Sequence, residues 1–327
     1  MLSSREIRHL RSSQSKEKKR NSQQHTDETT MYYYDTNSKS RRMAPSPTST
    51  GINSTSAVDD HNQKGEASST SGNVDTLISF FVTGFGPFGG NPENPTSTII
   101  EALQQEQTAE NPRLSNVHLL NIIRVSASSA AEEVNRIIDQ VKPHYNNTNS
   151  SQQQESTGKG CNNYKHAVII HFGVNHMKGQ KKVFQLEQNA FNEANFRIPD
   201  EDGFQPKNEQ ICESRPLRHK LSTDLSASRI KDNLTKKGFD VGLSGDAGRF
   251  VCNYIYWSSL QKVQEEAEMN NDNSTTEDGD VDIHVMFVHV PKFEDISKET
   301  QIEFSMELLD SIKETIIAKD KKKRKKG

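Results

Sequence analysis

The segment His166-Ala-Val-Ile-Ile-His-Phe-Gly-Val174 is a mostly apolar run in an otherwise polar chain. Its length and its β-branched residues predict a strand rather than a helix. Apolar and polar positions do not alternate along it, so both faces of the strand must be covered. Such strands are typical of parallel sheets that carry helices on both sides. The segment therefore predicts a buried strand in a layered α/β fold.

Shorter apolar runs before and after this segment alternate with stretches of helical periodicity. Strands are expected over 77–83, 117–125, 183–186 and 283–290, and helices over 128–141, 225–236 and 298–318 and from about 95 and 249. The helical spacing is clearest at Val134, Ile137, Ile138 and Val141. The alternation predicts a single-domain three-layer α/β/α sandwich with a mixed, mostly parallel sheet.

The composition shows that the 327-residue chain is not packed throughout. Its mean hydropathy is −0.85 and only 31% of its residues are hydrophobic. Residues 1–75 contain no apolar run that could offset the entropy of an ordered chain, so we expect a disordered polar tail there. The folded domain is expected over 76–318, with exposed polar inserts over 146–162 and 265–280.

Charge is concentrated at the two ends of the chain. The net charge is −3, yet residues 1–20 carry seven Lys or Arg against two Glu, and residues 319–327 carry seven against one Asp. Terminal lysine runs are more often solvated tails than nucleic-acid surfaces. We therefore expect a basic tail over 319–327 and no nucleic-acid partner, although nuclear entry through Lys321–Lys326 stays open.

Cysteine usage indicates a reducing compartment. Cys161, Cys212 and Cys252 form an odd, sparse set with no CxxC pair, and no secretory signal sequence is evident at the start of the chain. We expect a cytosolic protein. No stretch of the sequence approaches 18 consecutive apolar residues, so a membrane partner is not expected.

The loop Gly84-Phe-Gly-Pro-Phe-Gly-Gly90 has the glycine spacing of a dinucleotide-binding turn. Its context differs from that motif, because Pro87 and two phenylalanines crowd the turn and the segment 91–95 delays the following helix. A second interpretation is that Phe85 and Phe88 form the walls of a small apolar pocket. A third is that both rings simply pack in the core.

A possible nucleophile follows a second glycine turn. The stretch Ser244-Gly-Asp-Ala-Gly-Arg-Phe-Val-Cys252 leads into a helix, with Cys252 expected in its first turn. There the helix dipole and the free backbone N–H groups favour a thiolate over a thiol. Taken alone, a cysteine between Phe and Val is more often a small buried apolar residue.

Three further residues could complete a site around Cys252. His289 closes an apolar strand, at the end where α/β proteins place their sites. Glu187 also follows an apolar strand, where a carboxylate must be paired or solvated. Arg197 could stabilise an anion or be a plain surface residue. A thiol, an imidazole and a carboxylate are the parts of a cysteine nucleophile with its base and orienting acid, and only the fold can bring them together.

Taken together, these segments resemble the pyroglutamyl-peptidase I family of cysteine peptidases. The resemblance rests on four stretches in the family's order: Thr83-Gly-Phe-Gly-Pro-Phe-Gly-Gly90 with Asn94-Pro95, Glu187 with Asn192 and Arg197-Ile-Pro-Asp200, Asp246-Ala-Gly-Arg-Phe-Val-Cys252-Asn, and His289-Val-Pro291. The wording around 192–200 is closest to the plant-like branch of the family.

The resemblance implies that Cys252 is the nucleophile, His289 the general base and Glu187 the acid that orients it. It further implies that an N-terminal pyroglutamyl residue is removed from peptides without a metal or a cofactor. Pocket and support roles would fall to Phe85 and Phe88, whose rings would sandwich the pyrrolidone ring, and to Asn94, Val251 and Arg197. The oligomeric state is left open.

The chain departs from the family pattern in places. The stretch 173–187 is longer than usual, the Cys-to-His interval carries the acidic insert, and both tails lie outside the pattern. Two other functions therefore remain as alternatives. One is an inactive homologue that acts as an interaction protein, and the other is an NAD(P)-dependent oxidoreductase that uses the glycine loop.

Overall fold

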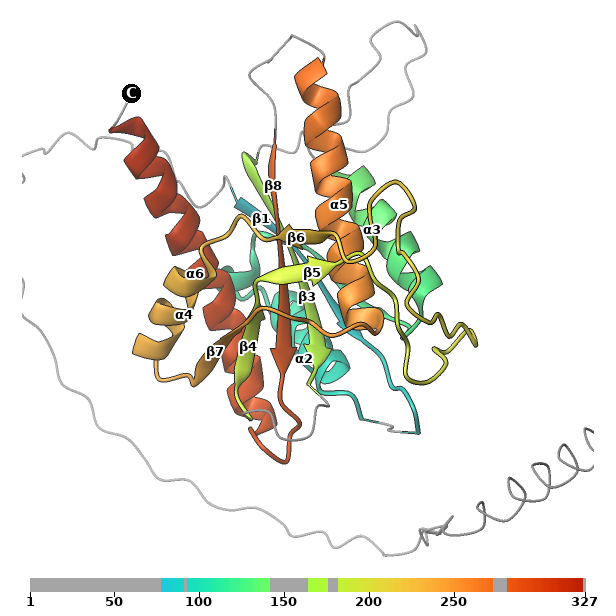
Figure 1. Cartoon of the computed structure of the whole chain (residues 1–327). Helices are drawn as coiled ribbons and strands as arrows, with labels where there is room; N and C mark the ends of the chain where they lie inside the picture. The colour runs from blue at the N-terminus through green and yellow to red at the C-terminus, as the bar shows by residue number, and fades with distance from the viewer. Residues whose placement is uncertain (1–77, 91–92, 142–163, 176–181, 273–280, 326–327) are drawn as a thin grey trace, which may run out of the picture. The chain divides into compact units, whose positions relative to one another are not determined.

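The computed structural model describes residues 78–90, 93–141, 164–175, 182–272 and 281–325 (Figure 1). All of them belong to one structural unit, which spans 68–327. The expected polar tail over 1–75 and the insert over 146–162 lie outside the described residues. The domain boundaries given above therefore remain predictions.

Six strands form the main sheet. In spatial order they are β2 (Val117–Ile123), β1 (Ile78–Phe85), β3 (His166–Val174), β8 (Asp282–Val290), β4 (Phe184–Glu187) and β7 (Val241–Ser244). The first four strands are mutually parallel, β4 runs antiparallel to β8, and β7 is parallel to β4. The mixed, mostly parallel sheet predicted from the sequence is confirmed.

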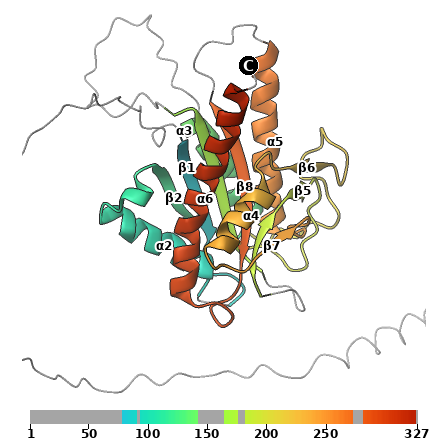
Figure 2. The same ribbon diagram turned by 90° about the vertical axis from the view of Figure 1, so that its left-hand side faces the viewer.

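Helices cover both faces of this sheet (Figures 1 and 2). One face packs against α2 (Pro95–Thr108), α4 (Ala227–Lys236) and α6 (Lys298–Arg324), and the other against α3 (Ala127–Val141) and α5 (Val251–Asp272). Along β3, Val168 and Ile170 belong to the first core, whereas Ala167 and Ile169 belong to the second. Because successive strand residues point to opposite faces, one continuous apolar run supplies both cores. The predicted three layers are confirmed.

Three short strands were not expected from the sequence. These are β7 and the antiparallel pair β5 (Asn189–Phe191) and β6 (Lys220–Ser222), and a 3₁₀ turn, η2 (Pro112–Leu114), precedes β2. Each of the three strands has only three or four residues. A run of that length carries too little periodicity to be distinguished from a loop.

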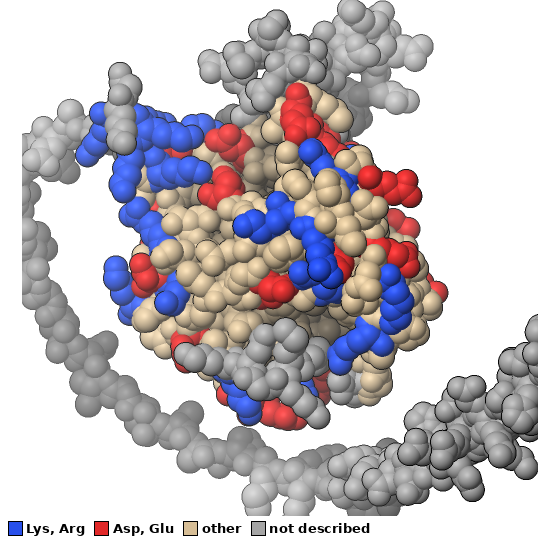
Figure 3. Space-filling model, in the orientation of Figure 1, with Lys and Arg blue, Asp and Glu red and all other residues tan. Residues whose placement is uncertain are grey.

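Two helices run further than their sequence predicts. Part of the insert expected over 265–280 is helical, because α5 continues to Asp272, and the rest of it lies outside the described residues. Glutamines within α5 donate to glutamates one turn on, as in the 3.0 Å bond from Gln261 to Glu265. The expected basic tail is likewise helical as far as Arg324, and the basic side chains of this last turn of α6 gather at one edge of the molecule (Figure 3). Asp320 holds this turn to the sheet through its 3.0 Å contact with His166.

The N-terminus of α2, which follows the glycine loop 84–90, is not free to bind a dinucleotide. Asn94 caps α2 by accepting the N–H of Thr96 at 3.1 Å, and its amide donates to the carbonyl of Gly86 at 2.7 Å. The Thr96 hydroxyl in turn accepts the N–H of Phe85 at 2.9 Å. The start of α2 is thus bonded to its own loop instead of being open to a pyrophosphate group. In the part of the chain that the structure describes, no helix is long and apolar enough to cross a membrane.

Replacing Phe304 by Ala tests how tightly α6 is held to the sheet. The Phe304 ring is fully buried and stacks on Phe184 of β4 with 3.6 Å between ring centroids. Its loss should lower the free energy of unfolding by about 3–5 kcal/mol. Urea denaturation measures this change, and Met269→Ala on exposed α5 surface is the control, which should stay within about 0.5 kcal/mol of the parent. Equal effects of the two substitutions would contradict the assigned packing.

Candidate active site

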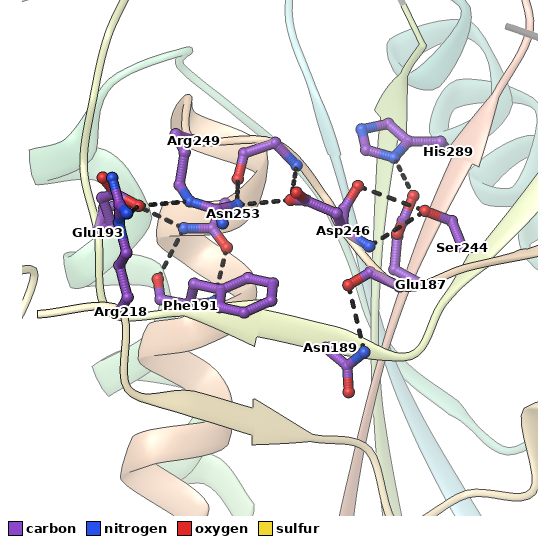
Figure 4. Close-up of polar contacts among 12 residues, drawn as sticks. Glu187, Asn189, Phe191, Glu193, Arg218, Ser244, Asp246, Arg249, Asn253 and His289 are labelled. Atoms are coloured by element: carbon purple, nitrogen blue, oxygen red, sulfur yellow. Dashed lines mark hydrogen bonds and ion pairs between the residues drawn. The ribbon is translucent and has the colours of Figure 1, made fainter. Parts of the chain in front are cut away.

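The antiparallel pairing of β4 with β8 brings Glu187 and His289 together. Gln185 lies opposite His289 and Glu187 opposite Phe287, so Glu187 and His289 are diagonal neighbours on one face of the sheet. The Nδ1 of His289 lies 2.7 Å from Oε1 of Glu187 (Figure 4). Glu187 is only 1% exposed, so this contact is a buried pair of a carboxylate with an imidazole.

Cys252 lies at the start of helix α5 and lines the same cavity as Glu187 and His289. It is the second residue of α5, as the sequence predicts, and its thiol is partly exposed. A cavity of about 450 Å³ is lined by Cys252, His289 and Glu187 together. The structure therefore assembles the thiol, the imidazole and the carboxylate at one cavity, although they lie far apart in the sequence.

The environment of His289 favours its charged form. Burial of the ring by itself lowers the pKa of His289, but hydrogen bonds and charge from Cys252 and Glu187 outweigh burial and raise the pKa to about 10. At neutral pH the ring is then an imidazolium whose Nδ1–H donates to Glu187. The other ring nitrogen, Nε2, is left for Cys252. This arrangement suits a thiolate–imidazolium pair.

Gly173 makes the room that the thiol occupies. It lies beside His289 in the parallel pairing of β3 with β8. A Cβ atom at this position would stand 3.0 Å from the sulfur of Cys252 and 2.6 Å from the ring of Phe287. Both distances are shorter than ordinary van der Waals contact, so only glycine fits between the strand and the nucleophile.

Several residues that line the cavity are polar, and they carry charge of both signs. Arg197, Asp246 and Arg249 contribute to its lining, as do the amide side chains of Asn175, Gln185 and Asn195. Arg197 is exposed and lines the same cavity as Cys252 and His289. Asp246 and Arg249 belong to the loop that leads into α5, and they bond to each other (Figure 4).

The structure places the predicted pocket residues differently. Phe85 is only 4% exposed, belongs to the core beneath α3 and α5, and does not line the cavity described above, so its role as a pocket wall stays a prediction. Phe88 packs 5.5 Å from Phe250, which does line the cavity. Val251 is fully buried and does not line this cavity, so its contact with a ligand stays a prediction. Asn94 supports the glycine loop through its bond to Gly86.

Sequence reasoning gave no role to several residues that the structure places at the site. Asp246 accepts the N–H of Gly248 at 3.0 Å, which is the turn that an Asp two residues before a glycine often makes. That spacing was visible in the sequence. The contacts of Arg249 and Gly173 were not, because they depend on segments far away in the chain.

The fold and the site define an α/β protein in which a buried histidine and glutamate line one cavity together with a cysteine at the start of a helix. A family model described as pyroglutamyl peptidase matches residues 124–316. This chain belongs to that family, as its motifs led us to expect. The plant-like branch within the family stays a prediction.

Individual relatives agree with this assignment. The pyrrolidone-carboxylate peptidase of Thermococcus litoralis is 28% identical over 180 residues, which cover 55% of this chain and 66% of the relative. That of Pyrococcus furiosus is 26% identical over 55% of this chain and 70% of the relative. This chain thus aligns with about two thirds of their length.

Solved structures show the same fold. The pyrrolidone carboxyl peptidase from Thermococcus litoralis superposes with a TM-score of 0.54 at 24% identity, over 74% of this chain and 96% of that one. The pyroglutamyl peptidase I of Bacillus amyloliquefaciens gives a TM-score of 0.53 at 20% identity, over 72% of this chain and 96% of that one.

Replacing Gly173 by Ala should crowd the thiol of Cys252. Because the new methyl group has no free space, we expect a loss of about 1–3 kcal/mol in the free energy of unfolding and slower alkylation of Cys252 by iodoacetamide. Mass spectrometry of the peptide that contains Cys252 measures the alkylation. Gly242→Ala on β7 is the matched control, since a Cβ there meets its nearest atom at 3.5 Å. Unchanged alkylation in Gly173→Ala would show that the glycine is not required.

Proposed function

We propose that this chain is a cysteine exopeptidase that hydrolyses the bond after an N-terminal pyroglutamyl residue of a peptide. The observation that carries the proposal is the meeting of Cys252, His289 and Glu187 at one cavity. The names of the relatives, pyrrolidone-carboxylate peptidases, support this choice of substrate. A volume of about 450 Å³ leaves space for part of the following residue beside the lactam ring.

The first half of the reaction forms an acyl-enzyme. The thiolate of Cys252 attacks the pyroglutamyl carbonyl carbon, a C–S bond forms, and the carbonyl oxygen becomes an oxyanion. As the intermediate collapses, the C–N bond breaks and His289 gives its proton to the leaving amine. The products of this half are a thioester on Cys252 and a peptide shortened by one residue.

The second half returns the enzyme to its starting state. His289, now neutral, takes a proton from a water molecule that attacks the thioester carbonyl. The C–S bond breaks, free pyroglutamate leaves, and the thiolate–imidazolium pair forms again. Glu187 accepts from Nδ1–H throughout, so the ring keeps Nε2 toward the reacting atoms.

The start of α5 supplies groups for the oxyanion. The first backbone N–H groups of a helix have no intrahelical partner, and the positive end of the helix dipole lies beside them. Cys252 stands in this first turn, so its sulfur and those donors approach the same carbonyl. Arg197, which also lines the cavity, adds positive charge on the substrate side.

The chemistry of the cavity suits a lactam better than an ordinary N-terminus. Val174, Ala247 and Phe250 give it apolar walls, with Phe88 packed behind Phe250. A pyroglutamyl ring is uncharged, whereas a free α-amino group would lose its hydration there. It would also meet His289, which is already cationic. This explains selectivity for a blocked N-terminus.

Replacing Cys252 by Ala tests the nucleophile. Release of coumarin from a pyroglutamyl-coumarin amide should fall to background, because alanine at this position has no thiol to form the thioester. A prolyl analogue, which lacks the ring carbonyl, and a glutaminyl analogue should not be cleaved by the parent protein. Full activity in the Cys252→Ala protein would refute the scheme.

Replacing Glu187 by Gln tests the orienting acid. The Glu187 carboxylate helps to raise the pKa of His289, so its loss lowers that pKa and the imidazolium is lost at a lower pH. We expect kcat/KM to fall on the order of 10³–10⁴-fold, with the alkaline limb of its pH profile moved to lower pH. The control is Glu133→Gln, another buried glutamate, which pairs with Arg136 on α3. If the alkaline limb of the pH profile did not move in Glu187→Gln, Glu187 would not be what raises the pKa of His289.

A further inference from the structure

Residues 191–193, which follow Glu187, are hydrogen-bonded to helix α5 just after Cys252. Asn253, which follows Cys252, is fully buried. Its Oδ1 accepts the N–H of Phe191 at 2.9 Å, and its Nδ2 donates to the carbonyls of Phe191 at 2.8 Å and Glu193 at 3.1 Å (Figure 4). The first turn of α5 is thus held against the chain that continues from β4.

An ion pair fastens the upstream side of the nucleophile to the same segment. The Glu193 side chain is only 4% exposed, and its Oε2 accepts from Nε of Arg249 at 2.9 Å. The guanidinium of Arg249 also lies over the ring of Phe191, 4.2 Å from its centroid. Since Arg249 stands three residues before Cys252, the cysteine lies between two attachments to residues 191–193.

The loop before Cys252 depends on the upstream attachment for its shape. Arg249 bonds to the carboxylate of Asp246, which itself accepts the N–H of Gly248 at 3.0 Å. Gly248 has φ +84°, a conformation that residues with a side chain rarely adopt. Asp246, Gly248 and Arg249 all line the cavity. A buried carboxylate on one side and an Asp-stabilised turn on the other therefore hold the Arg249 side chain in place.

We propose that the Glu193–Arg249 ion pair positions Cys252 against His289 and Glu187. The inference rests on the proposed function in taking Cys252 as the nucleophile. Glu187 and Glu193 belong to one stretch of chain. The Glu193–Arg249 ion pair therefore holds the loop before Cys252 at a fixed place relative to Glu187. Arg249 and Glu193 are positioning residues, because they act through the placement of Cys252.

The second partner of Glu193 provides a matched comparison. Nε of Arg218 lies 3.1 Å from the same carboxylate oxygen, but its side chain is 68% exposed and is not part of the cavity lining. An exposed partner contributes little to holding a buried carboxylate in place. If the proposal is right, only the arginine on the nucleophile's loop matters for the reactivity of Cys252.

Charge alone predicts a different pattern from positioning. Without Arg249 the thiolate would lose a nearby cation, which slows its reactions, whereas without Glu193 it would lose a nearby anion, which speeds them. Loss of position slows the reactions in both cases. The signs of the two effects therefore distinguish a positioning pair from a field effect.

The experiment compares Glu193→Gln, Arg249→Met and their double variant with Arg218→Met in the full chain. Three quantities are measured: the rate at which iodoacetamide alkylates Cys252, kcat and KM for the pyroglutamyl-coumarin amide, and the melting temperature. We expect both single variants to slow alkylation and lower kcat by about 10-fold or more, with KM within about 2-fold of the parent. The double variant should lose no more than the worse single variant, and Arg218→Met should stay within about 2-fold.

Other results would overturn the proposal. Opposite effects of Glu193→Gln and Arg249→Met on alkylation would indicate a field effect. Lower melting temperatures with unchanged alkylation and kcat would indicate a purely structural pair. The two proposals can fail separately, because alkylation of Cys252 needs no substrate. If the parent protein cleaved no pyroglutamyl compound, the proposed function would be wrong, but the alkylation rates would still test the ion pair.

Discussion

The buried contact between Glu187 and His289 is the interaction on which the site depends. It exists because β4 runs against the direction of its neighbour β8, which sets Glu187 diagonally across from the histidine. A carboxylate that is 1% exposed is costly without a partner, and an imidazolium is the partner that offsets that cost. The same pairing fixes the orientation of the ring and leaves Nε2 for the thiol.

The layers of the fold then supply the third group. Helix α5 packs on the sheet through residues such as Val251 and Ile255, so its first turn is anchored beside the end of β8. Gly173 leaves the space into which the sulfur of Cys252 fits. Asn253 and Arg249 join this helix to the chain that follows Glu187. The position of Cys252 therefore depends on the packing of α5, on the space left by Gly173 and on two polar attachments.

Much of this arrangement could be predicted from the sequence. Continuous apolar runs such as 166–174 indicated a sheet covered on both faces, and the order of strands and helices indicated three layers. The three residues proposed to react could be named because each follows a recognisable strand or turn. The limits are also physical. The sequence alone left the place of the Phe85 ring open, because a ring in a glycine turn can pack inward as well as outward; in the structure Phe85 is 4% exposed. The Glu193–Arg249 pair joins side chains 56 residues apart, so local pattern could not reveal it. The cytosolic location and the roles of the tails stay predictions.

In the proposed reaction, Cys252 carries the pyroglutamyl group as a thioester. To test this, the protein is mixed with an activated pyroglutamyl ester, the reaction is stopped with acid within milliseconds, and the mass of the chain and of its peptides is determined. We expect one added pyroglutamyl group on the peptide that contains Cys252, and none with the prolyl ester. An adduct on another residue, or turnover of the ester with no adduct in the folded, reduced protein, would contradict it.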